Sequence, residues 1–280
     1  MEIQEIKVKD CIAFKDNPFK IRETLDMELL VESIAENGVL IPIVVRKAKS
    51  NQYEVISGQR RIYACQKAGI ESIPAIVEEL SRDESIIMLV DANLHREGLL
   101  PSEKGFAYKM KLDALKHQGK ASAQLGPKMT SVQYIANSSS DSKTQVQRYI
   151  RLTHLIKPLL DMVDEGRIAL TPAVEVSYLT KEEQYDLVDA IAREEHTPSL
   201  SQAMRLKALS KDGILDYQAI YEIIKETKGN QIEYLKVPTE RIRNYFKPNT
   251  TYRQMEDVIL KALSFYTHYK AKHRDDKDSR

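Results

Sequence analysis

Cysteine is scarce in this sequence, with only Cys11 and Cys65 among 280 residues, and tryptophan is absent. The two cysteines stand far apart, so they fit neither a disulfide framework nor the spacing of a zinc site. No run reaches the roughly 18 apolar residues that a membrane-spanning helix needs. The first ten residues, MEIQEIKVKD, are charged and lack the apolar centre of a secretion signal. We therefore expect a cytoplasmic protein without a membrane partner.

The sequence also has almost no net charge, because 42 Lys and Arg balance 41 Asp and Glu to give +1. The distribution of charge is uneven. Residues 104–157 contain ten basic and two acidic residues, a balance of +8, whereas residues 158–200 contain ten acidic and three basic residues, a balance of −7. This boundary indicates a basic functional segment followed by a segment with a different role, although two solvated helical faces would give the same pattern.

The first hundred residues alternate between strand patterns and helix patterns. One helix pattern carries Leu29, Leu30, Ile34 and Ala35 at helical spacing and ends at Asn37-Gly38, a typical C-cap. A second helix pattern is short and stops at Gly69. The strand patterns are rich in β-branched residues or alternate in polarity, and they occupy residues 2–12, 39–48, 52–58 and 72–79. We predict a small α/β domain at residues 1–98.

After Leu80 the pattern is almost entirely helical. Helix patterns occupy residues 82–97 and 100–119, the segment 120–129 is typical of a hinge, and further helices follow it. We predict an all-α domain at residues 99–198 and a helical segment at residues 199–280. The chain as a whole is then an α+β protein.

Gly58 ends one of the strand patterns and is followed at once by Gln59, Arg60 and Arg61. A glycine lets the backbone approach a ligand, a helix beginning there offers free N–H groups, and two arginines add planar donor groups. Together these features suit a phosphate. The alternative is that both arginines pair with surface acids, namely Glu54, Glu78 or Glu79, and the local pattern does not choose between the two.

A second polar group occurs at the predicted end of the helix at 82–97. Asn93 carries an amide oxygen that suits a hard cation such as Mg²⁺, and His95 and Arg96 follow it. Such side chains often only cap and solvate a helix terminus, so this segment alone does not establish a site.

Residues 131–155 have the spacing of a helix-turn-helix. Ile135 and Ala136 are placed to pack against Val146 and Tyr149, and Ser142 with Gln145 forms a potential capping box where the second helix should begin. An ordinary helical hairpin with a charged face is the alternative. The residue types on the predicted exposed face bond both to base edges and to phosphates, and the predicted DNA-binding set is Lys143, Thr144, Gln145, Gln147, Arg148 and Arg151.

Several segments, in this order, resemble the N-terminal domain of the ParB partition-protein family: IQEIKVKD, NPFKIR, ESIAENGVLIPIVV, YEVISGQRRIYA, SIPAIV, NLHRE and LPSE. The resemblance covers about 100 residues and continues through the helix-turn-helix. It implies an N-terminal fold related to sulfiredoxin and a site for CTP with Mg²⁺. The implied base and ribose contacts are Gly38, Val39, Leu40, Ile41 and Pro42, the implied phosphate contacts are Gly58 to Arg61, and Asn93, His95 and Arg96 would close over phosphate and metal, with Asn93 as metal ligand.

The resemblance further implies a homodimeric, CTP-dependent clamp on double-stranded DNA at a centromere-like inverted repeat, working with a ParA-type ATPase. Its role would be partition of a plasmid, a mobile element or a chromosome. Two residues depart from the family pattern: Gln59 stands where an acidic residue is usual, and Ala92 where a glutamate is usual. We therefore expect weak CTPase activity at most. A helix-turn-helix transcriptional or replication regulator with a vestigial nucleotide pocket is the alternative, and an enzyme of the sulfiredoxin or small-kinase type is a third.

The last eighty residues carry no recognisable motif. Within them an apolar stripe at helical spacing suits either a subunit seam or the core face of a terminal helix, and its members are Met255, Val258, Ile259, Ala262, Leu263 and Tyr266.

Overall fold

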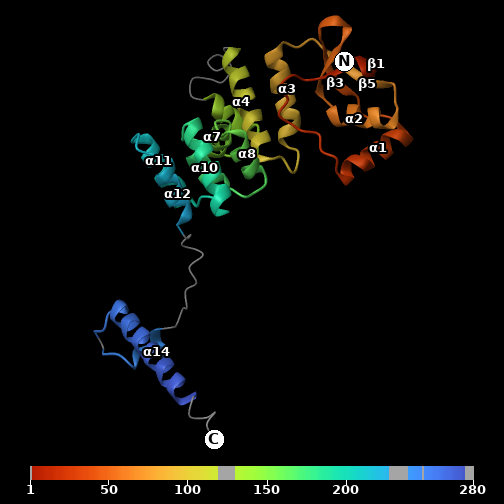
Figure 1. Cartoon of the computed structure of the whole chain (residues 1–280). Coiled ribbons are helices and arrows are strands. Elements are labelled where there is room, and N and C mark those ends of the chain that lie inside the picture. The colour runs from red at the N-terminus through yellow and green to blue at the C-terminus, as the bar shows by residue number, and fades with distance from the viewer. Residues whose placement is uncertain (1, 119–129, 227–238, 248, 275–280) are drawn as a thin grey trace. The chain divides into compact units, whose positions relative to one another are not determined.

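The computed structural model of the chain describes residues 2–118, 130–226, 239–247 and 249–274. The predicted hinge at 120–129 therefore lies outside the described residues. The fold is α+β, as the sequence predicts, and the chain forms two compact units, residues 1–226 and 227–280 (Figure 1).

The first unit begins with a five-stranded mixed sheet in the order β1-β5-β3-β4-β2. β1 and β3 lie on either side of β5, antiparallel and parallel to it respectively, and β4 lies antiparallel to β3 and parallel to β2. The strands are β1 (Ile3–Lys7), β2 (Cys11–Ala13), β3 (Ile43–Lys47), β4 (Tyr53–Ser57) and β5 (Ser72–Glu78).

The predicted strand at 2–12 is in fact two strands, and they form the two opposite edges of the sheet. A 3-10 turn at Val8–Asp10 separates β1 from β2. The turn follows directly on the β1–β5 ladder, which the N–H of the buried Val8 extends by donating to the carbonyl of Glu71. The polarity pattern of the segment did not reveal this break.

Helices cover both faces of the sheet. Val45 and Val55 point into one apolar cluster that includes residues of helices α1 (Leu25–Asn37) and α2 (Gln59–Ala68), whereas the neighbouring residues Val44 and Ile56 pack into a second cluster with α3 (Arg82–Leu94). This alternation follows from the two-residue period of a strand. The end of β4 therefore lies between the two helical layers, and α2 begins directly after it.

Helix α1 differs from the prediction in the face that it buries. Met27 and Ile34 are its buried residues, whereas Leu29 is 55% exposed and Ala35 is exposed. The helix touches the rest of the domain along a narrow line, so only part of its apolar stripe enters the core. Leu29 instead lines a cavity, which is described below.

The helical part of the first unit contains two connected regions. The apolar cluster around α3 continues into helices α4 (Pro101–His117), α6 (Ser131–Asn137) and α7 (Lys143–Leu152), so the layer beside the sheet is also the core of the helix-turn-helix. A further cluster joins the remaining helices, which are α8 (Lys157–Asp164), α9 (Leu170–Val176), α10 (Lys181–Glu194), α11 (Leu200–Lys211) and α12 (Tyr217–Lys225).

The third predicted segment was placed too early in the chain. Leu206 on α11 and Ile220 on α12 are fully buried in the same cluster as Leu187 on α10, so residues 199–226 pack with the preceding helices. The second unit contains α13 (Thr239–Arg243) and the longer α14 (Tyr252–Arg274).

Most of the apolar stripe on α14 is exposed within its own unit. Met255 is buried, whereas Val258, Leu263 and Tyr266 are each more than half exposed. In the described part of the chain, no helix has the length and apolar content to cross a membrane.

Candidate nucleotide cavity and nucleic-acid interface

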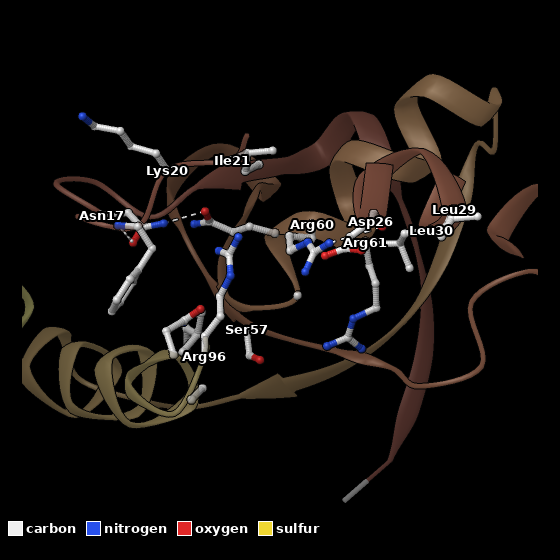
Figure 2. Close-up of a pocket in the computed structure, with 16 residues that line it drawn as sticks. Asn17, Lys20, Ile21, Asp26, Leu29, Leu30, Ser57, Arg60, Arg61 and Arg96 are labelled. Atoms are coloured by element: carbon white, nitrogen blue, oxygen red, sulfur yellow. Dashed lines mark hydrogen bonds between the residues drawn. The ribbon is translucent and has the colours of Figure 1, made fainter. Parts of the chain in front are cut away.

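A cavity of about 550 Å³ lies where the loop before α1, the start of α2 and the end of α3 meet (Figure 2). Ile21, Leu29 and Leu30 give it an apolar wall. Four cationic side chains from three separate segments also line it, namely Lys20, Arg60, Arg61 and Arg96. Asp26 is the sole acid among the lining residues, so the cavity has a positive balance that suits a polyanion.

Gly58 shapes the floor of this cavity. Its φ of 102° lies in the region that favours glycine, and a Cβ atom there would lie 2.4 Å from Cγ2 of the buried Ile43. Gly58 is also the N-cap of α2. The first N–H groups of that ten-residue helix therefore begin at the cavity wall, at the positive end of the helix dipole.

The two arginines after Gly58 do not form the surface ion pairs that were the alternative. Glu54 is occupied by Arg46, whose Nη2 lies 2.6 Å from Glu54 Oε2. Arg60 donates instead to the backbone carbonyl of Asp26 at 3.4 Å, and Arg61 donates to the carbonyls of Ile41 and Pro42. Because carbonyls carry no full charge, both guanidinium groups keep their positive charge for another partner.

Two buried polar atoms on the cavity wall have no hydrogen-bond partner. They are Nε2 of Gln59 and Nε of Arg60. Oε1 of Gln59 accepts from Nδ2 of Asn17 at 2.5 Å, which holds the amide in place and leaves its donor end free. Buried donors without partners are rare in folded proteins. Their position indicates a cavity built for a ligand with acceptor oxygens.

The pKa values of two arginines at the cavity are lowered by their surroundings. Burial lowers the pKa of Arg61 from its ordinary value. Burial first, and then the charge of the neighbouring Arg60, lowers the pKa of Arg96. A bound anion would offset this unfavourable crowding of positive charge.

The loop that contributes Asn17, Lys20 and Ile21 was not among the predicted site residues, although its sequence, NPFKIR, belongs to the resemblance. Glu103 on α4, which is 2% exposed, holds this loop: its carboxylate accepts from the N–H of Lys20 at 2.9 Å and pairs with Arg22 at 2.6 Å. The helix-turn-helix region thus positions one wall of the cavity. Spacing within the loop alone could not reveal a partner more than eighty residues away.

The structure does not bring all predicted site residues to the cavity. The segment 38–42 and His95 are not among its lining residues, and Leu40 and Ile41 are 81% and 69% exposed. The segment 38–42 meets the site only through its carbonyls, which accept from Arg61. The predicted residues that do line the cavity are Gly58, Gln59, Arg60, Arg61, Asn93 and Arg96.

The last residues of α3 face two different surroundings. Ala92 and Asn93 line the cavity, and the Asn93 Nδ2 donates to the carbonyl of Leu89 at 2.8 Å, which leaves its amide oxygen available. Asp91 instead pairs with the fully buried Lys111 on α4. Asp91 therefore does not supply a carboxylate to the cavity in place of Ala92.

The helix-turn-helix has the predicted packing. Ile135, Ala136 and Val146 are buried between α6 and α7, and Oγ of Ser142 accepts from the N–H of Gln145 at 3.3 Å at the start of α7. This is the N-cap half of the predicted capping box. Ser140 does not adopt a positive φ, so the turn does not need the glycine that is usual there.

Five of the six predicted DNA-binding residues on α7 are exposed, namely Lys143, Thr144, Gln145, Gln147 and Arg148. Arg151 is not free to read DNA. Its Nε and Nη2 donate to the hydroxyl and carbonyl of Ser177 at 3.0 and 2.8 Å, and its guanidinium lies 3.9 Å from the centroid of the Tyr178 ring. The last turn of α7 packs against α9, which removes Arg151 from the exposed face.

The turn before α7 is anchored to α4 by Asp141. Its Oδ2 accepts from Nζ of Lys104 at 2.9 Å and from the hydroxyl of Tyr108 at 2.6 Å, and burial together with this bond raises the pKa of Tyr108. At Gly105, an added Cβ would lie 2.6 Å from the carbonyl oxygen of Tyr149, so α4 and α7 cross closely. Helix α4 therefore holds both α7 and the turn before it in place.

Residues 1–94 match the model of the ParB N-terminal domain. The chain is similar to the stage 0 sporulation protein J of Bacillus subtilis (strain 168), with 30% identity over 171 residues that make up 60% of this chain and 55% of that protein. The chain spans about half the length of the curated relatives it matches.

Solved structures of the C-terminally truncated chromosome-partitioning protein ParB from Caulobacter crescentus are also similar. The complex with the centromeric parS site has 21% identity and a TM-score of 0.44, and it covers 75% of this chain and 99% of that chain. The complex with CTP-γ-S has 24% identity and a TM-score of 0.33, and it covers 69% of this chain and 99% of that chain. Residues 1–94 of this chain therefore match the ParB N-terminal domain, and a longer part of the chain is similar in sequence to chromosome-partitioning proteins.

Proposed function

We propose that this protein is a sequence-specific DNA-binding protein of the partition type that acts in the cytoplasm as a CTP-dependent clamp. As a homodimer it would recognise an inverted repeat and cooperate with a ParA-type ATPase. The observation that carries the proposal is the cavity, where cations from three segments surround unpartnered donors of Gln59 and Arg60. The exposed polar face of α7 belongs to the same compact unit.

The residues of the cavity suit distinct parts of a nucleoside triphosphate. The start of α2 with Arg60 and Arg61 would bind the phosphates, because free N–H groups and guanidinium donors match phosphate oxygens. Arg96 approaches from α3 and would close over the phosphate chain. The apolar wall of Ile21, Leu29 and Leu30 would contact the base and ribose.

Asn93 would contribute one oxygen ligand to Mg²⁺, which helps to neutralise phosphate charge when it is bound. The described residues contain no group of three or more His, Cys, Asp or Glu side chains that would hold a metal by themselves. The nucleotide phosphates would therefore supply most of the ligands, as is usual for Mg²⁺ bound with a nucleotide.

The same residues favour slow hydrolysis or none. Hydrolysis requires a water molecule positioned for attack, and the cavity offers Gln59 where an acid is usual. The Gln59 amide is held by Asn17 and does not accept a proton at neutral pH. Ala92 offers no polar group, and Asp91 is paired with Lys111 outside the cavity. The nucleotide would thus act as a switch that favours one conformation in proportion to its preference for that state.

Calorimetry with CTP, ATP and GTP, each with Mg²⁺ and with and without a DNA site selected from a random library, tests the proposal. We expect a preference for CTP, which Arg61→Ala removes. Lys67→Ala, on the exposed far end of the same helix, should leave the affinity unchanged. The absence of any preference for CTP would instead favour the regulator with a vestigial pocket.

Phosphate release measured in the same samples tests the catalytic part of the proposal. We expect little release from the unaltered protein and more from Ala92→Glu, with similar nucleotide affinity. Rapid release by the unaltered protein would show that Gln59 and Ala92 do not limit hydrolysis.

A further inference from the structure

The N-terminal domain concentrates its positive charge in two places. Residues 1–98 contain thirteen Lys and Arg against seventeen Asp and Glu, a balance of −4. Four of these cations line the nucleotide cavity. Five others line a separate open groove beside the edge strand β2, which we call the edge groove, and they are Lys15, Arg46, Lys47, Lys49 and Arg82.

Two arginines of the edge groove pack on one aromatic side chain. The guanidinium groups of Arg46 and Arg82 lie 5.6 and 5.4 Å from the centroid of the buried Phe14 ring, so one aromatic side chain orients both. Glu54, the one acid among the lining residues, is 6% exposed, and its carboxylate accepts from Arg46 and from the N–H of Lys15. It therefore offers little charge to the solvent.

The rim of the edge groove carries free charge. Lys15, Lys47 and Lys49 are exposed, and none of them forms an ion pair with another described residue. Arg46 and Arg82 are paired with Glu54 and Asp16, so the three lysines carry the net positive charge of the edge groove. Within an acidic domain this excess creates a local positive potential, which attracts an anion with several charges at regular spacing.

We propose that the edge groove binds the phosphodiester backbone of double-stranded DNA without regard to sequence. An acidic peptide that adds a strand to the sheet is the competing partner. Strand β2 has only three residues, and exposed Lys15 follows it closely, which are features that discourage strand addition at a sheet edge. The lysines instead suit a partner that is bound through its charge and forms no backbone hydrogen bonds with the strand.

This inference does not depend on nucleotide binding or on the reading helix. If the clamp proposal is wrong, the edge groove would still bind DNA. It would add a second contact, on the sheet domain, to the contact made by α7.

The test compares the intact chain with the triple variant Lys15→Gln, Lys47→Gln, Lys49→Gln on a random-sequence duplex across a salt series without nucleotide. The triple variant Lys7→Gln, Lys9→Gln, Lys67→Gln is the matched control, because these residues belong to the same domain and lie outside the edge groove. Arg148→Ala is introduced in parallel to reduce binding by the reading helix.

We expect the groove variant to bind at least about tenfold more weakly at low salt and to reduce the slope of log K against log salt by about 2 to 3, since each phosphate contact contributes roughly 0.9. The decrease should persist with Arg148→Ala, and thermal melting should show that the variant is folded. An unchanged slope, or an equal decrease in the control, would overturn the proposal. Loss of binding to a polyglutamate peptide with unchanged DNA binding would overturn it in favour of an acidic protein partner.

Discussion

The buried ammonium group of Lys111 pairs with Asp91, one residue before the cavity wall, and also donates to Oγ of Ser138 in the turn of the helix-turn-helix at 2.7 Å. Lys111 is fully buried, whereas the Asp91 side chain is 42% exposed. One side chain of α4 therefore connects α3, which ends at the cavity, with the turn that precedes α7.

This asymmetry in exposure predicts unequal effects of two substitutions. Asp91→Ala leaves a buried charge without a charged partner, next to Ser138 and the Tyr134 ring, and should lower the free energy of unfolding by about 3 kcal/mol. Lys111→Met leaves a carboxylate that water can reach, so it should cost clearly less. Chemical denaturation of both variants and of the double variant measures this difference. Equal losses in the two single variants would contradict the structural interpretation.

The Lys111–Asp91 pair also predicts energetic coupling between nucleotide binding at the cavity and DNA binding by α7. In Lys111→Met, we expect the effect of CTP on DNA affinity to shrink, while the affinity for each ligand measured alone changes little. Titration of DNA with and without CTP gives this coupling factor. If the factor equals that of the unaltered protein, Lys111 has a structural role only.

The reading helix α7 predicts that two of its arginines respond differently to substitution. Arg148→Ala, on the exposed face, should weaken binding to a selected site by about 1 to 3 kcal/mol if the contact is bidentate to a base, with little change in stability. Arg151→Ala should mainly lower stability, because it removes the bonds to Ser177 and the contact with Tyr178. Fluorescence anisotropy on selected and random duplexes, with thermal melts, separates the two effects. Gln147→Ala should behave like Arg148→Ala.

Gly58 and Gly69 form a matched pair at the two ends of α2. Both have positive φ, but a Cβ would collide with Ile43 only at Gly58. Gly69→Ala should therefore cost about 1 kcal/mol. Gly58→Ala should cost about 1 to 3 kcal/mol more from the added clash and should also abolish nucleotide binding. Denaturation and calorimetry on both variants check this, and similar stability losses would show that Ile43 moves aside.

The exposed stripe on α14 predicts self-association through the second unit. Leu263→Glu should weaken the dimer at least tenfold, because Leu263 is 55% exposed and would be buried against a second copy. Lys261→Glu, on the opposite side of the helix, is the control. Sedimentation equilibrium measures the association. If a chain ending at residue 226 remains dimeric, the dimer interface lies elsewhere.

Much of the local structure could be predicted from the sequence because it depends on neighbours. The helix that ends at Gly69, the strands at β3, β4 and β5, and the N-cap at Ser142 follow from the period of apolar residues and from nearby capping groups. The grouping of Gly58, Arg60 and Arg61 at the cavity is also local, since all three residues lie at one strand end.

Features that depend on contacts between residues far apart in the chain became visible only in the tertiary structure. Three predicted features changed for this reason: the strand at 2–12 divides between the two opposite edges of the sheet, Arg151 donates to Ser177, and residues 199–226 join the preceding core. The cavity wall from Asn17 to Ile21 depends in the same way on Glu103. The sequence by itself determined most of the helices and strands and the segments that place arginines beside a glycine, because those properties depend on residues a few positions apart. Which charges remain free for a ligand was decided only when residues distant in the chain came into hydrogen-bonding range.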